Sequence, residues 1–316
     1  MISCIIPCYG SENSIAAVVD EIKRTLEGRA GTEYEIILVN DASPDGVLEV
    51  ARSICHAESN VKVIDLAKNF GQHNALMAGI NHACGDAYVF LDDDGQTPAD
   101  EIWKLIDALD DDCDVVFAKF ANKQHALWRN LGSRINSYMM EVLLGKPKGL
   151  YLSAYSAFKG FIADELRRYD GMYSYTWGLL LRSAKKIKNV DVAHREREIG
   201  DSGYTIKKLL SLWFNGFTAF SVKPLRIATV MGCVFAIFGF VYGVYIVAFR
   251  LLNPDIAVGF TSLMAVLLLI GGMIMVILGL IGEYIGRIYI SINNSPQFVV
   301  REKIGFDEAD GDGEEK

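Results

Sequence analysis

The stretch AYVFLDDDGQTP, residues 87–98, joins an apolar run to three consecutive carboxylates. Its first five residues have the composition of a strand buried on both faces, so the acids follow the carboxyl end of that strand. In open α/β sheets this end of the strands forms the ligand crevice. Carboxylate oxygens suit a divalent cation, Mg²⁺ or Mn²⁺, that carries a substrate diphosphate. The stretch therefore predicts a strand of an α/β sheet and a metal site beside it.

The spacing of the three acids distinguishes their expected roles. Asp92 and Asp94 are separated by one residue, so on an extended chain their side chains point to the same side. We expect these two to share the cation, and we expect Asp93, which points the other way, to be the most replaceable of the three. The alternative is an acidic surface turn, because two aspartates at this spacing are common in proteins.

Apolar strands and helical segments alternate on either side of this stretch. The segment Ser11–Leu26 has apolar residues at helical spacing, and further helices are expected up to about His56, over His73–Ala83 and over Pro98–Leu109. This alternation predicts a mostly parallel sheet that is covered by helices on both faces. The predicted strands are Ile2–Ile6, Glu35–Val39, Val61–Leu66, Ala87–Leu91 and Asp114–Phe120.

Two uncharged stretches near the end of the chain are long enough to cross a bilayer. They comprise 23 residues, Ile227–Phe249, and 27 residues, Ile256–Gly282, against about 20 needed for a span. The turn between them contains one basic residue, Arg250, whereas lysines and arginines gather on their outer flanks. The positive-inside rule then predicts a two-span protein of the cytoplasmic (inner) membrane with both termini in the cytoplasm.

An aromatic segment, Tyr204–Phe220, precedes the first predicted span. It combines leucines, phenylalanines and Trp213 with two lysines, which is typical of an amphipathic helix at a membrane interface. A core helix of the soluble domain is the alternative. The expected organisation is a catalytic domain over 1–202, an interfacial segment over 203–224, a transmembrane hairpin over 225–290, and a cytoplasmic tail over 291–316 with a disordered acidic end.

Composition excludes some classes of function. The net charge is -8, and the acidic tail from Asp307 to the end carries most of it, so the body has no basic surface for nucleic acid. The six cysteines are scattered without a CxxC pair, which is typical of reduced thiols and predicts no zinc site. The chain begins with a predicted strand rather than a basic and then apolar segment, so we expect no secretory signal.

Four short motifs each follow a predicted strand. They are IPCYGSE at 6–12, VNDASPD at 39–45, NFGQ at 69–72 and LDDDGQ at 91–96. In this order they resemble family 2 glycosyltransferases of the GT-A fold, an α/β fold with a Rossmann-like, mostly parallel sheet. Two later motifs, REIGDSGY at 197–204 and FSVKPLR at 220–226, are similar to the branch of dolichol-phosphate mannosyltransferases and bacterial polyprenyl-phosphate glycosyltransferases.

The resemblance implies a nucleotide-sugar donor, with uridine favoured over guanosine, and a polyprenyl phosphate acceptor at the lipid bilayer. It also implies homo-oligomers that assemble through the membrane helices. It gives matching residues a role: Pro7, Tyr9, Glu12 and Asp41 hold the nucleotide base and ribose, Asp92 and Asp94 hold Mg²⁺ or Mn²⁺, and Gln96 lies against the donor sugar or diphosphate. Arg197 and Ser202 face the diphosphate or the acceptor phosphate, and Arg129 and Ser133 face the acceptor phosphate. We also expect Lys159 to bind the acceptor phosphate. For Arg129 and Ser133, a solvated helix face is the alternative.

The chain departs from the branch at one position that matters for catalysis. Where relatives read GDFR, this chain reads SAFK at 156–159, so Ala157 stands where a carboxylate is expected. A general base at this position is therefore in doubt. A polyprenyl phosphate needs less activation than a hydroxyl, because it is already anionic, so we expect the cation to carry most of the catalysis. Asn40 also replaces the first acid of the motif that relatives read as DDGS.

These observations together predict a membrane-anchored, metal-dependent, inverting glycosyltransferase that moves one sugar to polyprenyl phosphate at the cytoplasmic face. A processive polysaccharide synthase is one alternative, although such enzymes usually carry QxxRW and more spans, and Gln124 and Trp128 here have the wrong spacing. A catalytically idle membrane adaptor is another, which the alanine at position 157 favours.

Overall fold

A computed structural model describes residues 1–120, 140–141, 145–172, 174–193, 223–252, 260–293 and 296–306. The chain divides into two units, and the segment that contains the two long helices is separate from the rest. The two units are therefore described one at a time.

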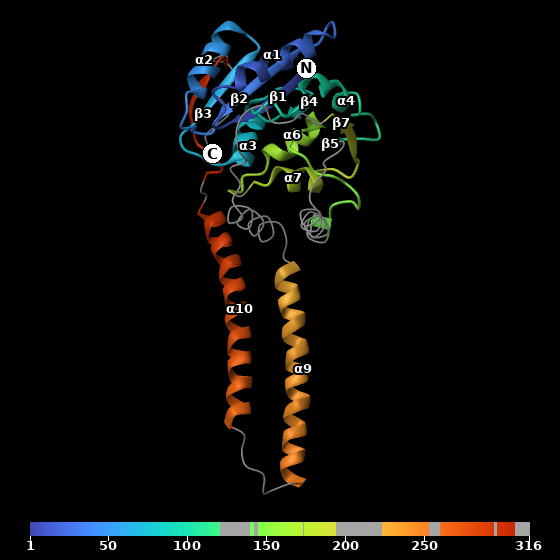
Figure 1. Ribbon diagram of the computed structural model, residues 1–316, viewed down its shortest axis with the longest axis vertical. Helices are drawn as coiled ribbons and strands as arrows, with labels where there is room; N and C mark the ends of the chain where they lie inside the picture. The colour runs from blue at the N-terminus through green and yellow to red at the C-terminus, as the bar shows by residue number, and fades with distance from the viewer. Residues whose placement is uncertain are drawn as a thin grey trace. The chain divides into compact units, whose positions relative to one another are not determined.

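An eight-stranded sheet forms the centre of the first unit (Figure 1), in the order β7-β5-β6-β4-β1-β2-β3-β8. All neighbours pair in parallel except β6, which is antiparallel to β4 and β5, and β8, which is antiparallel to β3. The sheet confirms the mostly parallel architecture expected from the sequence. The strands are β1 Ile2–Cys8, β2 Tyr34–Asn40, β3 Val61–Leu66, β4 Ala87–Phe90, β5 Val115–Phe120, β6 Ser156–Lys159, β7 Ile187–Val192 and β8 Val300–Ile304.

Helices cover both faces of this sheet. On one face, α1, α2 and α4 bury their apolar sides against alternate strand residues such as Ile6 and Leu38. On the other face, α3 approaches β1 so closely that a Cβ at Gly79 would lie 2.3 Å from Cγ2 of Ile5. The helices of this unit are α1 Ile15–Glu27, α2 Val47–Ala57, α3 Gln72–His82, the short 3₁₀ turn η1 Ala99–Glu101, α4 Ile102–Ile106, α6 Gly160–Arg167 and α7 Thr176–Ser183.

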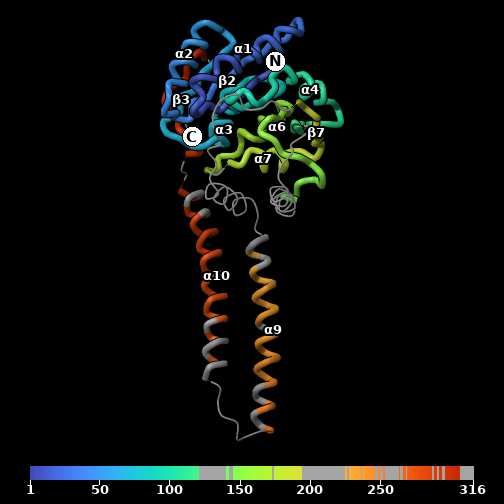
Figure 2. The backbone as a smooth tube through the Cα atoms, in the orientation of Figure 1, coloured from blue at the N-terminus to red at the C-terminus, as the bar shows by residue number. Residues whose placement is uncertain are grey.

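Strand β8 is an addition that the sequence did not predict. It lies within the segment expected to be a tail. Figure 2 nevertheless shows the chain returning to the sheet, where β8 pairs with β3 from the first part of the sequence. Its register places Lys303 opposite Ile64 and Glu302 opposite Asp65. The first unit therefore includes residues that precede the two long helices in the sequence and residues that follow them.

The second unit contains α9, Lys223–Leu252, and α10, Phe260–Ile292. Within them, Ala228–Tyr245 and Leu269–Gly286 are apolar enough to cross a membrane, and these windows are not buried in protein. Large apolar side chains such as Phe238, Phe240 and Val276 are more than two-thirds exposed. Helices of this length with exposed apolar surfaces are typical of membrane spans. The predicted interfacial segment lies almost wholly outside the described residues.

Candidate active site

The carboxyl ends of β1 and β4 lie side by side at the point where the chain reverses its direction across the sheet. From β1 the chain continues outward through β2 and β3, and then returns to β4 on the other side of β1. In open α/β sheets, such a switch point is where the ligand crevice forms. The loops that follow these two strands contain Tyr9 and the acidic triplet, so the structure brings two of the predicted motifs together.

Asp92 and Asp94 occupy the loop after β4, and both side chains are partly exposed. One oxygen of Asp92 accepts a hydrogen bond from the side-chain amide of Gln72 (3.0 Å), and one oxygen of Asp94 accepts the backbone N–H of Gln96 (3.0 Å). Gly95 has a φ of +73°, so the loop turns back at a conformation that glycine adopts readily. Each predicted ligand is therefore fixed in place by a neighbouring amide.

The two carboxylates fit a divalent cation by chemistry and exposure. Both offer hard oxygen atoms at an accessible loop, as Mg²⁺ and Mn²⁺ require. Among the residues that the structure describes, no group of three or more acidic, histidine or cysteine side chains gathers around a potential metal position. A cation held by Asp92 and Asp94 would need further ligands, which phosphate oxygens and water can supply.

Asp93 has contacts that the sequence did not suggest. Its side chain points away toward the first loop, where Oδ2 accepts the backbone N–H of Tyr9 (2.9 Å). Its carbonyl oxygen accepts the hydroxyl of Ser14 (2.6 Å). Burial raises the pKa of Asp93, and the hydrogen bond from Tyr9 opposes that rise. Because Asp93 joins the triplet to the β1–α1 loop, these contacts argue against the expectation that it is the most replaceable of the three acids.

Asp41, the first residue after β2, is 3% exposed and organises the start of α3. Its two oxygens accept the backbone N–H groups of Phe70 (2.6 Å) and Gly71 (2.8 Å). Burial raises the pKa of this carboxyl, and the two hydrogen bonds oppose that effect. Gly71 has a φ of +85°, which lets the chain turn sharply into α3. The contacts seen here are to the protein's own backbone, and a nucleotide role for Asp41 stays a prediction.

The loop after β2, residues 41–46, is tied to the loop after β1 by side-chain hydrogen bonds. Glu12 accepts the backbone N–H of Gly46 (3.0 Å), and Asp45 accepts that of Glu12 (2.9 Å). Ser43 donates its hydroxyl to Asp45 (2.5 Å) and accepts the N–H of Gly10 (2.8 Å). Ser43 and Asp45 had no expected role, although serine and aspartate are typical of turns in which a side chain hydrogen-bonds the backbone.

Hydrogen bonds hold the pKa of Asp45 below its ordinary value. Burial alone would raise the pKa of Asp45, but hydrogen bonds from the Ser43 hydroxyl and from the N–H groups of Glu12 and Val47 outweigh burial and lower the pKa.

Two of the predicted nucleotide residues, Pro7 and Tyr9, differ in exposure. Pro7 is buried within β1, whereas Tyr9 is 54% exposed beside the triplet. Only Tyr9 of these two therefore presents a side chain that a base can contact.

Lys159 lies away from this site. Strand β6 is antiparallel to β4 and pairs Lys159 with Ala87, at the amino end of β4. The ammonium group donates to Asp114 Oδ1 (3.1 Å) and to the carbonyl of Asp110 (2.8 Å). The contact of Lys159 with an acceptor phosphate stays a prediction that these contacts do not support, and the sequence does not reveal that the strand runs in the opposite direction.

Ala157 is also not a site position. It is buried in the core between β4 and β5, opposite Val89 and Val116. A carboxylate there would face the core and not the crevice. The alanine therefore does not identify a lost catalytic acid, and it gives no support to an idle adaptor.

Four predicted residues lie outside the described residues: Arg129, Ser133, Arg197 and Ser202. Their roles toward the diphosphate and the acceptor phosphate stay predictions. Close to the candidate site, one described histidine is a packing residue. His73, in the first turn of α3, contacts the rings of Tyr175 and Trp177, and burial lowers its pKa to about 4.

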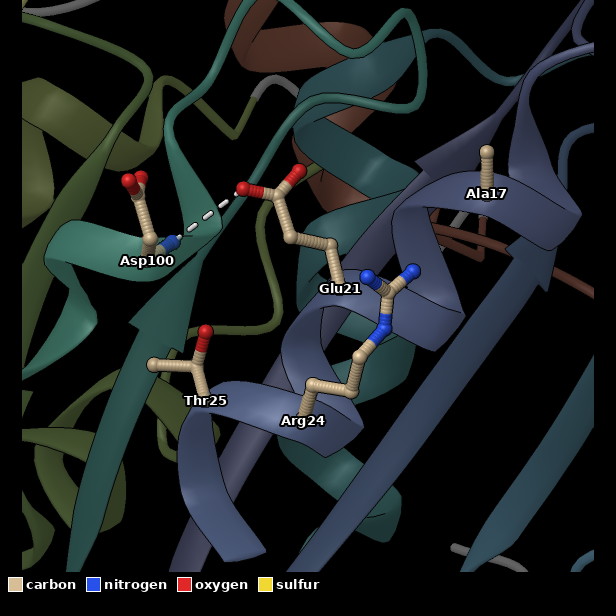
Figure 3. A pocket seen from close by; sticks show the side chains of 5 residues that line it. All are labelled: Ala17, Glu21, Arg24, Thr25 and Asp100. Carbon is tan, nitrogen blue, oxygen red and sulfur yellow. Dashed lines mark hydrogen bonds between the residues drawn. The ribbon is translucent and has the colours of Figure 1, made fainter. Parts of the chain in front are cut away.

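Two surface hollows lined by described residues of the first unit lie away from the candidate site. One hollow, shown in Figure 3, lies between α1 and η1, where Glu21 accepts the backbone N–H of Asp100 (3.3 Å). Another contains Cys84, Asp86 and Lys159, at the amino end of β4. Neither includes a residue of the β1, β2 or β4 carboxyl-end loops, and the candidate site is located by its strand ends and its chemistry.

Comparison with known proteins gives two family matches along the chain. Residues 3–166 match Glycosyl transferase family 2, and residues 223–288 match the GtrB C-terminal hairpin. The chain is 34% identical over 319 residues to an undecaprenyl-phosphate 4-deoxy-4-formamido-L-arabinose transferase of Photorhabdus laumondii, with 99% of this chain and 97% of the relative covered. A transferase of the same name from Proteus mirabilis is 33% identical over 317 residues, with the same coverage.

Solved structures share the fold of the first unit. Glucosyl-3-phosphoglycerate synthase from Mycobacterium tuberculosis, in complex with Mn²⁺, UDP and phosphoglyceric acid, aligns with a TM-score of 0.50 at 17% identity, over 67% of this chain and 74% of its own. Mannosyl-3-phosphoglycerate synthase from Rubrobacter xylanophilus gives 0.50 at 15% identity, over 72% and 74%. The sheet with helices on both faces is thus a GT-A fold, and the matched hairpin with its two apolar helices makes the chain a membrane protein.

Proposed function

Because this chain is a glycosyltransferase of family 2 that also contains a GtrB-type hairpin, we propose that it transfers one sugar from a nucleoside diphosphate sugar to a polyprenyl phosphate. The observation that carries the proposal is the acidic triplet at the switch point of the sheet, joined through Asp93 to the loop that exposes Tyr9. Carboxylates on one loop and an exposed aromatic ring on the neighbouring loop suit a metal-bound nucleotide.

The acceptor is proposed from the relatives and from the membrane helices. Both full-length relatives are named as undecaprenyl-phosphate transferases, and the match to them includes the hairpin as well as the catalytic domain. A polyprenyl phosphate is held in the bilayer by its lipid chain, so an enzyme that uses it needs its site close to the membrane surface. The basic flanks of the two spans favour the cytoplasmic face.

The reaction we propose has modest chemical demands on the protein. The acceptor phosphate is an anion at neutral pH, so it can attack the anomeric carbon without a general base. The catalytic work is then to align the two substrates and to stabilise the charge that develops on the leaving diphosphate. Asp92 and Asp94 would hold Mg²⁺ or Mn²⁺, which supplies a positive charge for phosphate oxygens when it is bound.

The residues of this chain have proposed roles around that centre. Tyr9 would contact the nucleotide base. Glu12 would join the loop after β1 to the loop after β2 through its bond to the N–H of Gly46. Asp41 would join the loop after β2 to the start of α3 through its bonds to two backbone N–H groups. Gln96 lies within the same loop as the triplet and would face the donor sugar or diphosphate. We favour a uridine nucleotide because the motifs resemble that branch, and guanosine is the alternative to be tested.

A screen of labelled nucleotide sugars tests the proposal. Membranes that contain the full-length protein would be supplied with undecaprenyl phosphate and one labelled UDP- or GDP-sugar at a time, and the lipid fraction would be scored for a sugar-lipid. We expect one lipid product with a single sugar residue, absent in Asp94→Asn membranes. Label that appears only in a soluble saccharide would refute the lipid acceptor, and a lipid product with a growing sugar chain would favour a processive synthase.

A further inference from the structure

Strand β8 is connected to the proposed donor site through a buried carboxylate. Asp65, in β3, is 1% exposed. One of its oxygens accepts an Nη1–H of Arg301 in β8 (3.2 Å), and the other accepts the side-chain amide of Asn40 at the end of β2 (2.7 Å). Arg301 also donates to the carbonyl oxygen of Ala67 (2.8 Å), which fixes its guanidinium against β3. Three strands thus meet at one acid.

The chemistry of the partners fixes the orientation of Asn40. A carboxylate accepts hydrogen bonds, so the NH₂ group of Asn40 must face Asp65. Its amide oxygen then accepts the backbone N–H of Ser43 (3.2 Å). Asn40 therefore links Asp65 to the loop at residues 41–46 through one hydrogen bond to each. An aspartate at position 40 would instead place two carboxylates against each other in a buried setting, at a cost in free energy.

The loop that Asn40 holds has a conformation that needs support. Ala42 has a φ of +49°, a left-handed conformation that is unfavourable for a residue with a Cβ. The N–H that Asn40 accepts belongs to the next residue, Ser43, whose hydroxyl in turn accepts the N–H of Gly10. The hydrogen bonds therefore continue from β8, through β3 and β2, into the loop after β1.

A buried carboxylate such as Asp65 is costly unless it is paired and hydrogen-bonded. Here Arg301 supplies the cation and Asn40 supplies the second donor. The neighbouring pair between Arg52 and Glu302 also joins β8 to the domain, but within the described part of the chain it makes no hydrogen bond to Asp65 or to the 41–46 loop. This arrangement separates a general role of β8 in stability from a specific role of Arg301.

We propose that Asn40, Asp65 and Arg301 act together as positioning residues for the 41–46 loop, so that the strand after the membrane hairpin forms part of the donor site. The inference rests on the proposed function, because that loop belongs to a donor site only if the enzyme uses a nucleotide sugar. None of the three residues touches the donor directly in this proposal. They set the position of the loop that does.

A swap of the two side chains tests the proposal. Asn40→Asp and Asp65→Asn each remove a matched donor and acceptor, and we expect each to weaken the binding of UDP, with Mn²⁺ present, by roughly tenfold. The double variant Asn40→Asp/Asp65→Asn restores the hydrogen bonds but not the ion pair, because the carboxylate at position 40 can accept from Ser43 and from the new amide, while Arg301 then donates to a neutral amide oxygen at position 65. We expect its affinity to recover most of the tenfold loss.

Binding would be measured by calorimetry on the full-length protein in detergent, with UDP and with GDP. Arg301→Gln should weaken binding in the same way, whereas Glu302→Gln is the control within β8 and should bind as the wild type does. A double variant that binds as weakly as the single variants would overturn the proposal, as would equal losses in Arg301→Gln and Glu302→Gln. Melting temperatures of all variants would show whether any loss reflects unfolding.

Hydrogen exchange separates this inference from the proposed function. In Arg301→Gln we expect the peptide that covers 41–46 to exchange about fivefold faster than in the wild type, with no such change in Glu302→Gln. Unchanged exchange in Arg301→Gln would overturn the positioning role even if nucleotide binding were normal. If the wild-type protein bound neither UDP nor GDP, the proposed donor would be wrong, and the assignment of the loop to a donor site would be overturned with it.

Discussion

Replacing Asp94 by asparagine should abolish most of the transferase activity while the fold is retained. Its Oδ1 accepts a hydrogen bond from the N–H of Gln96, at 3.0 Å, and an asparagine oxygen can accept the same bond. The loop should therefore keep its shape. What is lost is one of the two negative charges proposed to hold the cation, and Asp92 alone must then retain it.

The magnitude follows from what the cation is proposed to do. If it stabilises the charge on the leaving diphosphate, weakening its hold removes an electrostatic contribution that is typically worth roughly a hundredfold to a thousandfold in rate, or about 3–4 kcal/mol. Asp92→Asn should behave similarly, because the asparagine oxygen can still accept from Gln72. In both variants, raising the concentration of Mn²⁺ should recover part of the lost rate, since the ligands are weakened rather than removed.

The assay is the initial rate of sugar-lipid formation over a series of Mn²⁺ concentrations, together with the melting temperature. Asp86→Asn is the matched control, because Asp86 is an exposed acid at the amino end of β4 that pairs with the N-terminal amine. We expect the control to retain the wild-type rate. An Asp94→Asn enzyme with the wild-type rate and metal dependence would refute the metal site, and so would a wild-type rate that is insensitive to EDTA.

Three further predictions follow from the described contacts. Asp93→Ala removes the acceptor of the Tyr9 N–H, so nucleotide affinity should fall by roughly tenfold in calorimetry, with unchanged Mn²⁺ dependence; equal affinity would contradict a link between the two loops. Lys159→Met should leave the transfer rate unchanged while thermal unfolding shows a loss of about 1 kcal/mol, because its ion pair with Asp114 is structural. The pKa of Asp45 is lowered in the folded state, so the ionised carboxylate stabilises the fold at neutral pH, and this stabilisation is lost as the pH falls below 3.8, the ordinary pKa of an aspartate. The difference in melting temperature between the wild type and Asp45→Asn should therefore narrow in acid, and a constant difference would contradict this.

The fold of the catalytic domain was predictable because its strands are apolar and its helices are amphipathic. Strands β1 to β5 lie close to the ranges expected from the sequence, since burial on both faces leaves a continuous apolar run. The location of the triplet followed from the same rule, because acids after such a strand reach the carboxyl edge of the sheet. Apolar runs and helical periodicity are local features, so a single sequence is enough to detect them.

Strand β8 had no comparable signal. Its sequence, VREKI, is short and contains three charged residues, and its side chains alternate between partly buried and exposed. What holds it is pairing with the edge of β3 and the ion pair of Arg301 with Asp65, 236 residues away in sequence. Propensity and periodicity carry no information about partners at that distance. The contact of Asp93 with Tyr9 was missed for the same reason.

The direction of β6 determines what the missing carboxylate means. Because β6 runs antiparallel to β4, its first residue, Ser156, pairs with Phe90 at the crevice end, and Ala157 is directed into the core. An acid that faced the crevice from this part of the chain would have to precede β6, yet residues 145–155 contain neither aspartate nor glutamate. This segment therefore offers no carboxylate as a general base, whichever residue is aligned with the relatives' acid. A phosphate acceptor is already an anion, so the lipid phosphate that we propose does not require a base from this segment.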